Sequence, residues 1–295
     1  MSVLRAIATL SRPSLLPGVW SNCLAGWWLG GGGHSDVVPV LLAGVTLIFL
    51  GGCFLNDAFD AEFDQQHQPD RPIPSGVVSR KAVWTWGIGF LVAGALLCVW
   101  QRPATAVAGL VLVATVILFN ALHRWFALTP LVWGFCRLLL YLLGASVAVR
   151  GLTGWAIWSG LAAGCYAAGA AWLPRLQPKS NPALPWAAAL LGVPVALALI
   201  LNSGGYREAA LILSLVLVLW VVRSLRQGIW TRPQEPARSA PGLLAGIIVA
   251  DWLAVAHAPR ELHFVLIALL LATLALQAAA PRLGPAAGPS PASRA

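Results

Sequence analysis

The chain has 295 residues, of which 59% are hydrophobic and only 10% are charged. Soluble domains carry about 25% charged residues, so this composition excludes an ordinary soluble domain and predicts an integral membrane protein. The net charge of +9 would suggest nucleic acid as the partner of a soluble protein. Here the basic residues lie in short loops between apolar segments, where they set membrane topology. We therefore expect the lipid bilayer, and no nucleic acid, as a partner.

The apolar residues gather into segments that approach the roughly 20 residues needed to cross a bilayer. Ten such segments run over residues 13–31, 37–56, 82–100, 104–122, 130–149, 154–173, 185–201, 209–222, 241–256 and 262–280. Only a very short turn separates the last two, so a count of nine is also open. The sequence predicts an all-α, polytopic membrane bundle of nine to ten transmembrane helices. It forms one domain over residues 1–280, followed by a disordered tail over residues 281–295.

The loop charges predict the orientation of this bundle. If the N-terminus lies in the cytoplasm and the segments alternate, most loop Lys and Arg residues face inward. The outward-facing ones are Arg102, Arg150, Arg207 and Arg260. Cytoplasmic loops carry an excess of Lys and Arg. We therefore expect a multi-pass protein of the cytoplasmic (inner) membrane, with the N-terminus and the end of segment 37–56 on the cytoplasmic side.

A cluster of carboxylates follows segment 37–56 directly. Residues 56–64 read NDAFDAEFD and hold four of the ten acidic residues. If the helix continues to about residue 64, one face carries Asn56, Asp57, Asp60 and Asp64, while Glu62 lies opposite. Oxygen ligands without His or Cys suit Mg²⁺, which is usually held by one or two carboxylates plus substrate phosphates. The pattern therefore predicts Mg²⁺ as the cofactor and these four residues as its ligands.

A basic and rigid loop comes next. Residues 70–76 read DRPIPSG and are followed by Arg80 and Lys81. The two prolines stiffen the backbone. The planar guanidinium of Arg71 can form bidentate hydrogen bonds to a phosphate. Carboxylates for a metal, followed closely by a rigid arginine, together predict a diphosphate site at the membrane face.

These motifs resemble the UbiA superfamily of intramembrane prenyltransferases. The matching residues are Asn56, Asp57, Asp60, Asp64, the DRPIPSG segment, Arg12-Pro13 and Asn22. The resemblance implies transfer of a prenyl group from a polyprenyl diphosphate to an aromatic or other lipophilic acceptor. It also implies Asp60, Asp64 and Arg71 as catalytic residues, and a prenyl chain lying in an apolar tunnel that opens to lipid.

The sequence departs from that family at one position. Members carry a second aspartate-rich motif between the sixth and seventh segments, whereas residues 172–182 of this chain contain no acidic residue. Basic residues there would grip the diphosphate in place of a second metal. The residues expected to bind the diphosphate are Asn56, Arg71, Lys81, Arg137, Arg175 and Lys179. The run of residues 134–137, GFCR, together with Gly144, is similar to the EboC-type branch of the superfamily.

Two ionisable residues inside predicted spans have more than one interpretation. Charges within a membrane are costly and often functional. Arg137 either reaches the cavity beside the acidic cluster or extends its charged head to the interface. Asp251 is neutralised, paired or part of a cavity wall, and its partner does not follow from the sequence. We expect the histidines near helix ends, His123 among them, to lie at the membrane interface.

Two other functions remain open. The missing second motif favours a non-catalytic protein that binds or transports a prenylated or aromatic small molecule. Arg137 and Asp251 would serve a secondary transporter, but such proteins often contain internal repeats, and none is evident in the sequence.

Overall fold

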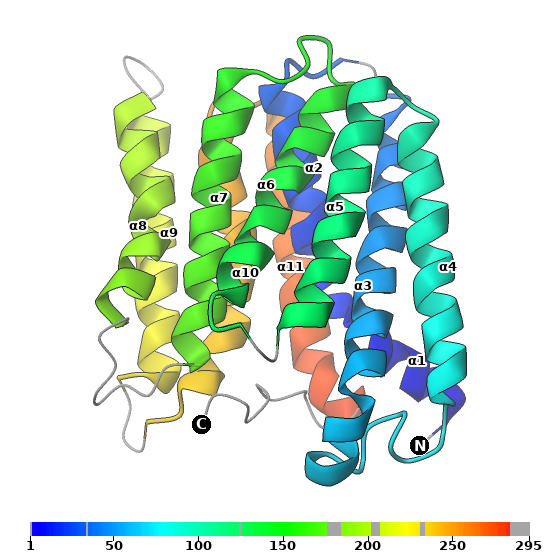
Figure 1. Cartoon of the computed structure of the whole chain (residues 1–295). Coiled ribbons are helices and arrows are strands. Elements are labelled where there is room, and N and C mark those ends of the chain that lie inside the picture. The colour runs from blue at the N-terminus through cyan, green and yellow to red at the C-terminus, as the bar shows by residue number, and fades with distance from the viewer. Residues whose placement is uncertain are drawn as a thin grey trace.

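The computed structural model describes residues 2–33, 35–123, 126–175, 184–201, 207–230 and 234–283. In lipid, every backbone N–H and C=O needs a partner within the protein, and a helix provides these partners internally. The apolar segments accordingly form helices, and the described residues contain no strand (Figure 1). The α-helices are α1 (Val3–Ser11), α2 (Leu16–Leu29), α3 (Val38–His67), α4 (Arg80–Val99), α5 (Pro103–Leu122), α6 (Thr129–Val147), α7 (Gly154–Trp172), α8 (Leu184–Leu201), α9 (Arg207–Gly228), α10 (Ala240–Ala254) and α11 (Arg260–Leu283). Short 3₁₀ helices are η1 (Pro13–Leu15), η2 (Leu173–Arg175) and η4 (Pro236–Ser239).

The helices agree with the predicted segments. Each segment overlaps one of the helices α2 to α11. Within the described ranges, seven helices are long and apolar enough to cross a membrane, namely α3, α4, α5, α6, α7, α9 and α11. The helices α2, α8 and α10 are shorter. The all-α, polytopic membrane fold is therefore confirmed, while the count of nine to ten spans stays a prediction. Helix α11 extends into the predicted tail, whose residues from 284 onward lie outside the described ranges.

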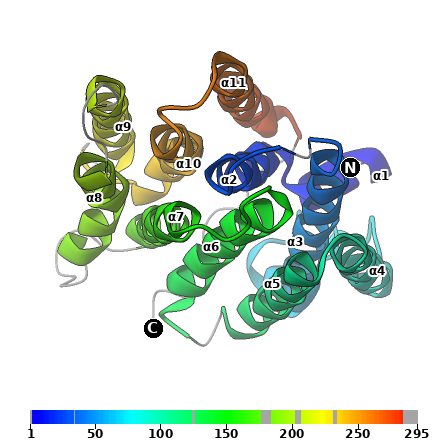
Figure 2. The same ribbon diagram turned by 90° about the horizontal axis from the view of Figure 1, so that it is seen from above.

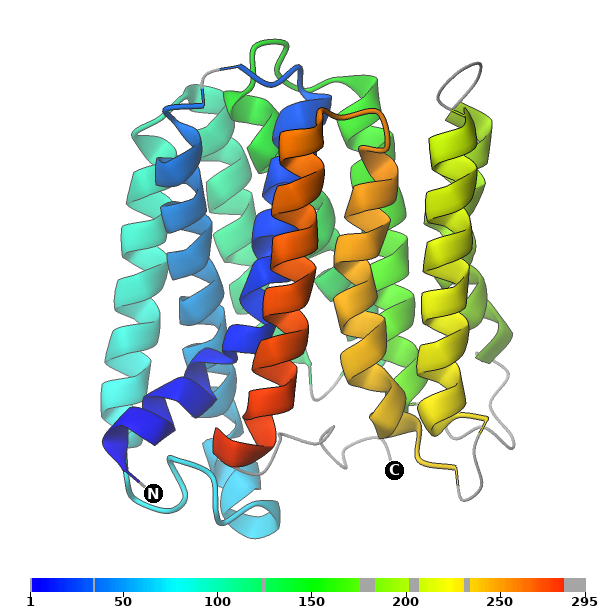
Figure 3. The same cartoon turned by 180° about the vertical axis from the view of Figure 1, so that it is seen from behind.

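The N-terminal helix α1 lies outside the predicted segments. Figure 3 shows it running obliquely across the end of the bundle, beside the lower end of α3. Its buried Ala6 and Leu10 pack with Phe54 and Ala58 of α3. The turn from α1 into η1 occurs at Arg12, which has a left-handed backbone with φ of 43°. Because this conformation is unfavourable for residues with a Cβ atom, packing on both sides of Arg12 must hold it in place.

Most helices of the bundle fall into two groups, as the end-on view shows (Figure 2), and α11 packs in a third cluster with α2, α6, α7 and α10. On one side, buried residues of α2, α3, α4, α5 and α6 make a common core. On the other side, α7, α8, α9 and α10 make a second core. The two cores adjoin where α6 packs on α7 and α2 packs on α10. The acidic end of α3 belongs to the first group, so the candidate site lies within α1 to α6.

Helix α3 is longer than a membrane requires. Its 30 residues span about 45 Å at 1.5 Å per residue, against a hydrocarbon core of about 30 Å. The last turns, which carry the carboxylates, therefore extend past the membrane face. The loop that follows folds back onto the bundle, because Ile73 and the buried Val78 pack into the cluster around Leu10 and Phe54. Its backbone is further held by bonds from Ser75 N–H to the carbonyl of Arg71 and from Val78 N–H to the carbonyl of Pro72.

Candidate functional site

The carboxylates of α3 divide into a buried face and an exposed one. The helix continues to His67, so the predicted extension of segment 37–56 is confirmed. On the inner face, Asp57, Asp60 and Asp64 are only 6%, 8% and 2% exposed. On the outer face, Glu62 is exposed and pairs with Arg80 at 2.7 Å. Since buried charges need partners, the three inner aspartates indicate an ionic site with oppositely charged groups beside them.

Two arginines from different parts of the chain hold this inner face. Arg12 Nη2 donates to Asn56 Oδ1 and to Asp57 Oδ1, both at 2.6 Å. Arg71 Nη1 donates to Asp64 Oδ2 at 2.6 Å and lies 3.8 Å from Asp57 Oδ1. The strained turn at Arg12 and the packed loop at Arg71 thus direct both guanidinium groups to the same helix face.

The third inner aspartate pairs with a histidine, a role that the sequence did not predict. His123, the C-cap residue directly after α5, places Nε2 at 2.9 Å from Asp60 Oδ1, and its Nδ1 lies 2.9 Å from the backbone carbonyl of Asn120. The two paired residues are 63 positions apart. No local motif links them, so only the packing of α5 against α3 reveals the pair.

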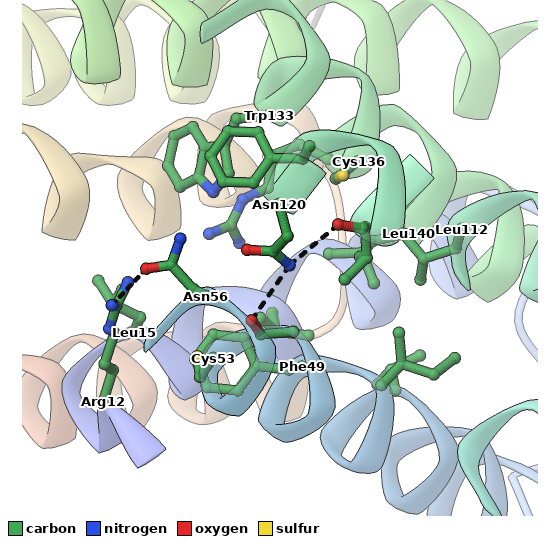
Figure 4. A pocket seen from close by; sticks show the side chains of 17 residues that line it. Arg12, Leu15, Phe49, Cys53, Asn56, Leu112, Asn120, Trp133, Cys136 and Leu140 are labelled. Carbon is green, nitrogen blue, oxygen red and sulfur yellow. Dashed lines mark hydrogen bonds between the residues drawn. The ribbon is translucent and has the colours of Figure 1, made fainter. Parts of the chain in front are cut away.

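An apolar cavity adjoins this ionic cluster between α2, α3, α5 and α6. Its volume is about 130 Å³, and Figure 4 shows Phe49, Leu112, Cys136 and Leu140 among its walls. Polar side chains line one part of it, namely Arg12, Asn56, Asn120 and Arg137. Because Arg12 contacts both the cavity and Asp57, the cavity and the carboxylates share one boundary.

Arg137 on α6 belongs to the cavity. The residue is 4% exposed, its guanidinium lies 4.7 Å above the ring of Trp133, and its Nη1 donates to Asn22 Oδ1 at 3.0 Å. Of the two interpretations of Arg137, the structure supports the cavity and not the interface. The amide nitrogen of Asn22 in turn donates to both carboxylate oxygens of Asp251 at 2.8 Å.

Asp251 on α10 is fully buried and has several donors around it. Besides Asn22, the hydroxyls of Ser21 and Tyr141 donate to its carboxylate. Asp251 therefore has the partners that the sequence did not reveal, and it links α10 to α2 and α6. Through Asn22, this network determines where the guanidinium of Arg137 lies.

Two other predicted diphosphate ligands, Lys81 and Arg175, lie apart from the wall of the described cavity. Lys81 is exposed at the start of α4. Arg175 donates to Thr129 Oγ1 at 3.4 Å, and neither residue lines the described cavity. Lys179 lies outside the described residues.

The oxygen atoms at this site fit Mg²⁺ in their chemistry, since three buried carboxylates and an amide oxygen are ligands that this ion accepts. Within the described ranges, however, no three His, Cys, Asp or Glu side chains are arranged to hold one ion. Arg12, Arg71 and His123 hold the carboxylates instead. Mg²⁺ at this site would have to displace basic partners from the aspartates, and phosphate oxygens of a substrate would supply further ligands.

Together, the helical bundle and its cavity define a class of protein: a polytopic membrane protein whose apolar cavity meets a charged site at one membrane face. Residues 19–244 match the UbiA prenyltransferase family. Since this match extends over more than half of the sequence, the chain belongs to the UbiA prenyltransferase family.

Curated relatives align with part of the chain. The digeranylgeranylglyceryl phosphate synthase of Methanoregula boonei is 38% identical over 84 residues, which are 28% of this chain and 30% of that protein. The chloroplastic chlorophyll synthase of Avena sativa is 33% identical over 101 residues, which are 31% of this chain and 27% of that protein. The aligned parts thus span less than a third of the length of these two relatives.

Solved structures resemble the whole bundle. The apo structure of a UbiA homolog from Aeropyrum pernix K1 has a TM-score of 0.65 and 16% identity, and the match covers 81% of this chain and 96% of that one. A UbiA homolog from Archaeoglobus fulgidus, bound to DMAPP and Mg²⁺, has a TM-score of 0.50 and 13% identity, with 92% and 99% covered. At these identities the likeness concerns the fold.

Proposed function

We propose that this chain is a Mg²⁺-dependent intramembrane prenyltransferase, which transfers a prenyl group from a polyprenyl diphosphate to an aromatic or other lipophilic acceptor. One observation carries the proposal. An apolar cavity meets Arg12, Asn56 and Arg137 at its polar part, and the same Arg12 contacts the buried carboxylate of Asp57. A prenyl diphosphate has the matching form, since its apolar chain ends in an anionic head.

The arginines would bind and orient the diphosphate. Arg71 and Arg12 present donors beside the aspartates, and Arg137 presents them from α6. The oxygen of Asn56 already accepts from Arg12, so its amide nitrogen is left to donate to a phosphate oxygen. This arrangement favours the diphosphate-binding role of Asn56 over its role as a metal ligand.

Transfer requires the bond between the allylic carbon and the diphosphate oxygen to break, with both electrons leaving on oxygen. The inner aspartates Asp57, Asp60 and Asp64, once released from their basic partners, would help to hold Mg²⁺, which would supply Lewis-acid stabilisation of that leaving group. The cavity wall would exclude water and place the aromatic faces of Phe49 and Phe119 near the positive charge on carbon. The acceptor then forms the new bond to that carbon and releases a proton.

The test is release of diphosphate by the purified full chain, supplied with Mg²⁺, labelled polyprenyl diphosphates and candidate acceptors. We expect Asp60→Asn and Asp64→Asn to lower the rate by about 100-fold or more, which is typical when a group that stabilises transition-state charge is lost. Chelation of Mg²⁺ should have the same effect. Glu62→Gln is the matched control on the outer face of α3 and should retain the rate. Equal rates in all three variants would refute the proposal.

A second candidate is a UbiA-like protein that binds or carries a prenylated or aromatic molecule without converting it. It is favoured by the absence of acidic residues from positions 172–182 and by the basic partner on each inner aspartate. Saturable binding of the prenyl diphosphate without diphosphate release, for every acceptor tried, would favour this candidate over the enzyme.

The proposed location is the cytoplasmic membrane, with the N-terminus and the carboxylates of α3 on the cytoplasmic side. The support comes from the ends of the helices. Arg102, Arg150, Arg207 and Arg260 lie at or next to the helix ends opposite the acidic end of α3. Arg71, Arg80 and Lys81 follow the acidic end itself.

A further inference from the structure

One side chain of the cavity has an unused hydrogen-bond acceptor. Asn120 on α5 is 3% exposed and lines the cavity. Its Oδ1 atom has no hydrogen-bond partner in the part of the chain that the structure describes. A buried polar atom left without a partner costs about 1–3 kcal/mol, and native proteins leave few such atoms. This residue of the cavity wall therefore holds an acceptor that a hydrogen-bond donor of a ligand would satisfy.

The other end of the amide determines its orientation. Nδ2 of Asn120 donates to the backbone carbonyl of Gly52 at 3.2 Å and to that of Val116 at 3.0 Å. Carbonyl oxygens only accept, so exchanging the amide nitrogen and oxygen would bring oxygen against oxygen. Figure 4 shows both bonds and the amide oxygen of Asn120 pointing away from them, toward the side where Asn56 lies. The two bonds thus hold the amide oxygen on the side of Asn56, a residue that also lines the cavity.

Neither part of a prenyl diphosphate satisfies this oxygen. The prenyl chain has no N–H or O–H group, and the diphosphate oxygens are acceptors that would repel another acceptor. A divalent cation does not fit there either, since the described cavity wall contains Arg12 and Arg137 but no carboxylate. Of the two substrates of the proposed reaction, only the acceptor can therefore bring the donor.

We propose that Asn120 selects a hydroxyl-bearing acceptor by accepting a hydrogen bond from that hydroxyl within the cavity. This inference rests on the proposed prenyl transfer, because that reaction brings a second substrate into the cavity. The bond orients the acceptor. It also discriminates against an ether or an ionised carboxylate at the same position, which have no hydrogen to donate. Both phenols and aliphatic alcohols have the required group.

The experiment measures binding by calorimetry on the purified full chain in detergent, without prenyl diphosphate. The probes are 2-naphthol with its methyl ether, and 1-decanol with its methyl ether. Wild type should bind at least one hydroxyl form about tenfold more tightly than its ether, the ratio expected for one buried hydrogen bond. Preference within the naphthol pair points to a phenol, and preference within the decanol pair points to an aliphatic alcohol. Asn120→Leu should bring the ratio close to one.

Gln101→Leu is the matched control. Gln101 Oε1 is also buried and unpaired in the described part of the chain, but this residue does not line the cavity, so the ratio should not change. A wild-type affinity ratio near one for both pairs would overturn the inference. This measurement uses the wild-type chain alone, so it does not depend on whether Asn120→Leu folds. A ratio that persists in folded Asn120→Leu or Asn120→Ala would also overturn it. Because no turnover is measured, failure here is separate from failure of the proposed prenyl transfer.

Discussion

Among single residues, Arg71 best illustrates how a short motif produces a site. The guanidinium bridges two aspartates on α3, at 2.6 Å from Asp64 and 3.8 Å from Asp57. The prolines beside it and the packing of Ile73 reduce the freedom of the loop that carries it. The side chain is therefore pre-organised, which lowers the entropy that binding a diphosphate must overcome.

This geometry predicts the effect of a substitution that keeps the charge. Arg71→Lys retains a cation but loses the planar fork that bonds two oxygens at once. We expect kcat/KM for the prenyl diphosphate to fall roughly 10- to 100-fold, the equivalent of one charged hydrogen bond. Steady-state kinetics on the purified protein would measure it. Arg80→Lys, on the exposed ion pair with Glu62, is the control and should behave as wild type. An unchanged kcat/KM in Arg71→Lys would exclude bidentate binding of the diphosphate by Arg71.

At the scale of elements, the close contact of α2 with α6 brings the cavity residues together. A Cβ atom added to Gly144 would collide with the backbone carbonyl of Cys23, and one added to Gly26 would collide with the carbonyl of Tyr141. Small residues of this kind let membrane helices approach closely. The approach brings Tyr141 within reach of Asp251 and places Arg137 beside Asn22.

Gly144→Ala should therefore destabilise the bundle. The helices must separate to accept the methyl group, and overpacking of this kind costs about 1–3 kcal/mol. A lower thermal unfolding temperature in detergent would report it. Gly89→Ala on the exposed face of α4 is the control, because a Cβ there meets nothing within 4 Å. It should be neutral or slightly stabilising. Identical unfolding temperatures for the two variants would contradict the tight contact.

At the scale of the whole molecule, the orientation in the membrane is the property to test. Ser75 lies in the exposed loop after α3, and Leu152 lies in the turn between α6 and α7 at the other end of the bundle (Figure 1). A membrane-impermeant maleimide applied to intact cells should label Leu152→Cys but not Ser75→Cys. Permeabilised cells should show labelling of both. The wild-type chain, whose five cysteines are buried or half-buried, supplies the background. The reverse pattern would place the carboxylates outside the cytoplasm.

By itself, the sequence determined what composition and local spacing control. The scarcity of charge and the length of the apolar segments required a helical membrane bundle. The spacing of Asp57, Asp60 and Asp64 required that they share a face of a helix, apart from Glu62. Helical periodicity and the partition of apolar residues into lipid are local properties, so they were predictable without any knowledge of distant contacts.

Only the tertiary structure decided which residues meet across the chain. It joined His123 to Asp60, Arg12 to Asp57, and Asp251 to the network around Arg137. It also left Lys81 and Arg175 away from the cavity wall and turned Asn120 toward it. These pairings depend on how helices distant in sequence pack. Packing follows from the shapes of whole surfaces, such as the glycine contact of α2 with α6, and not from the spacing within any one segment.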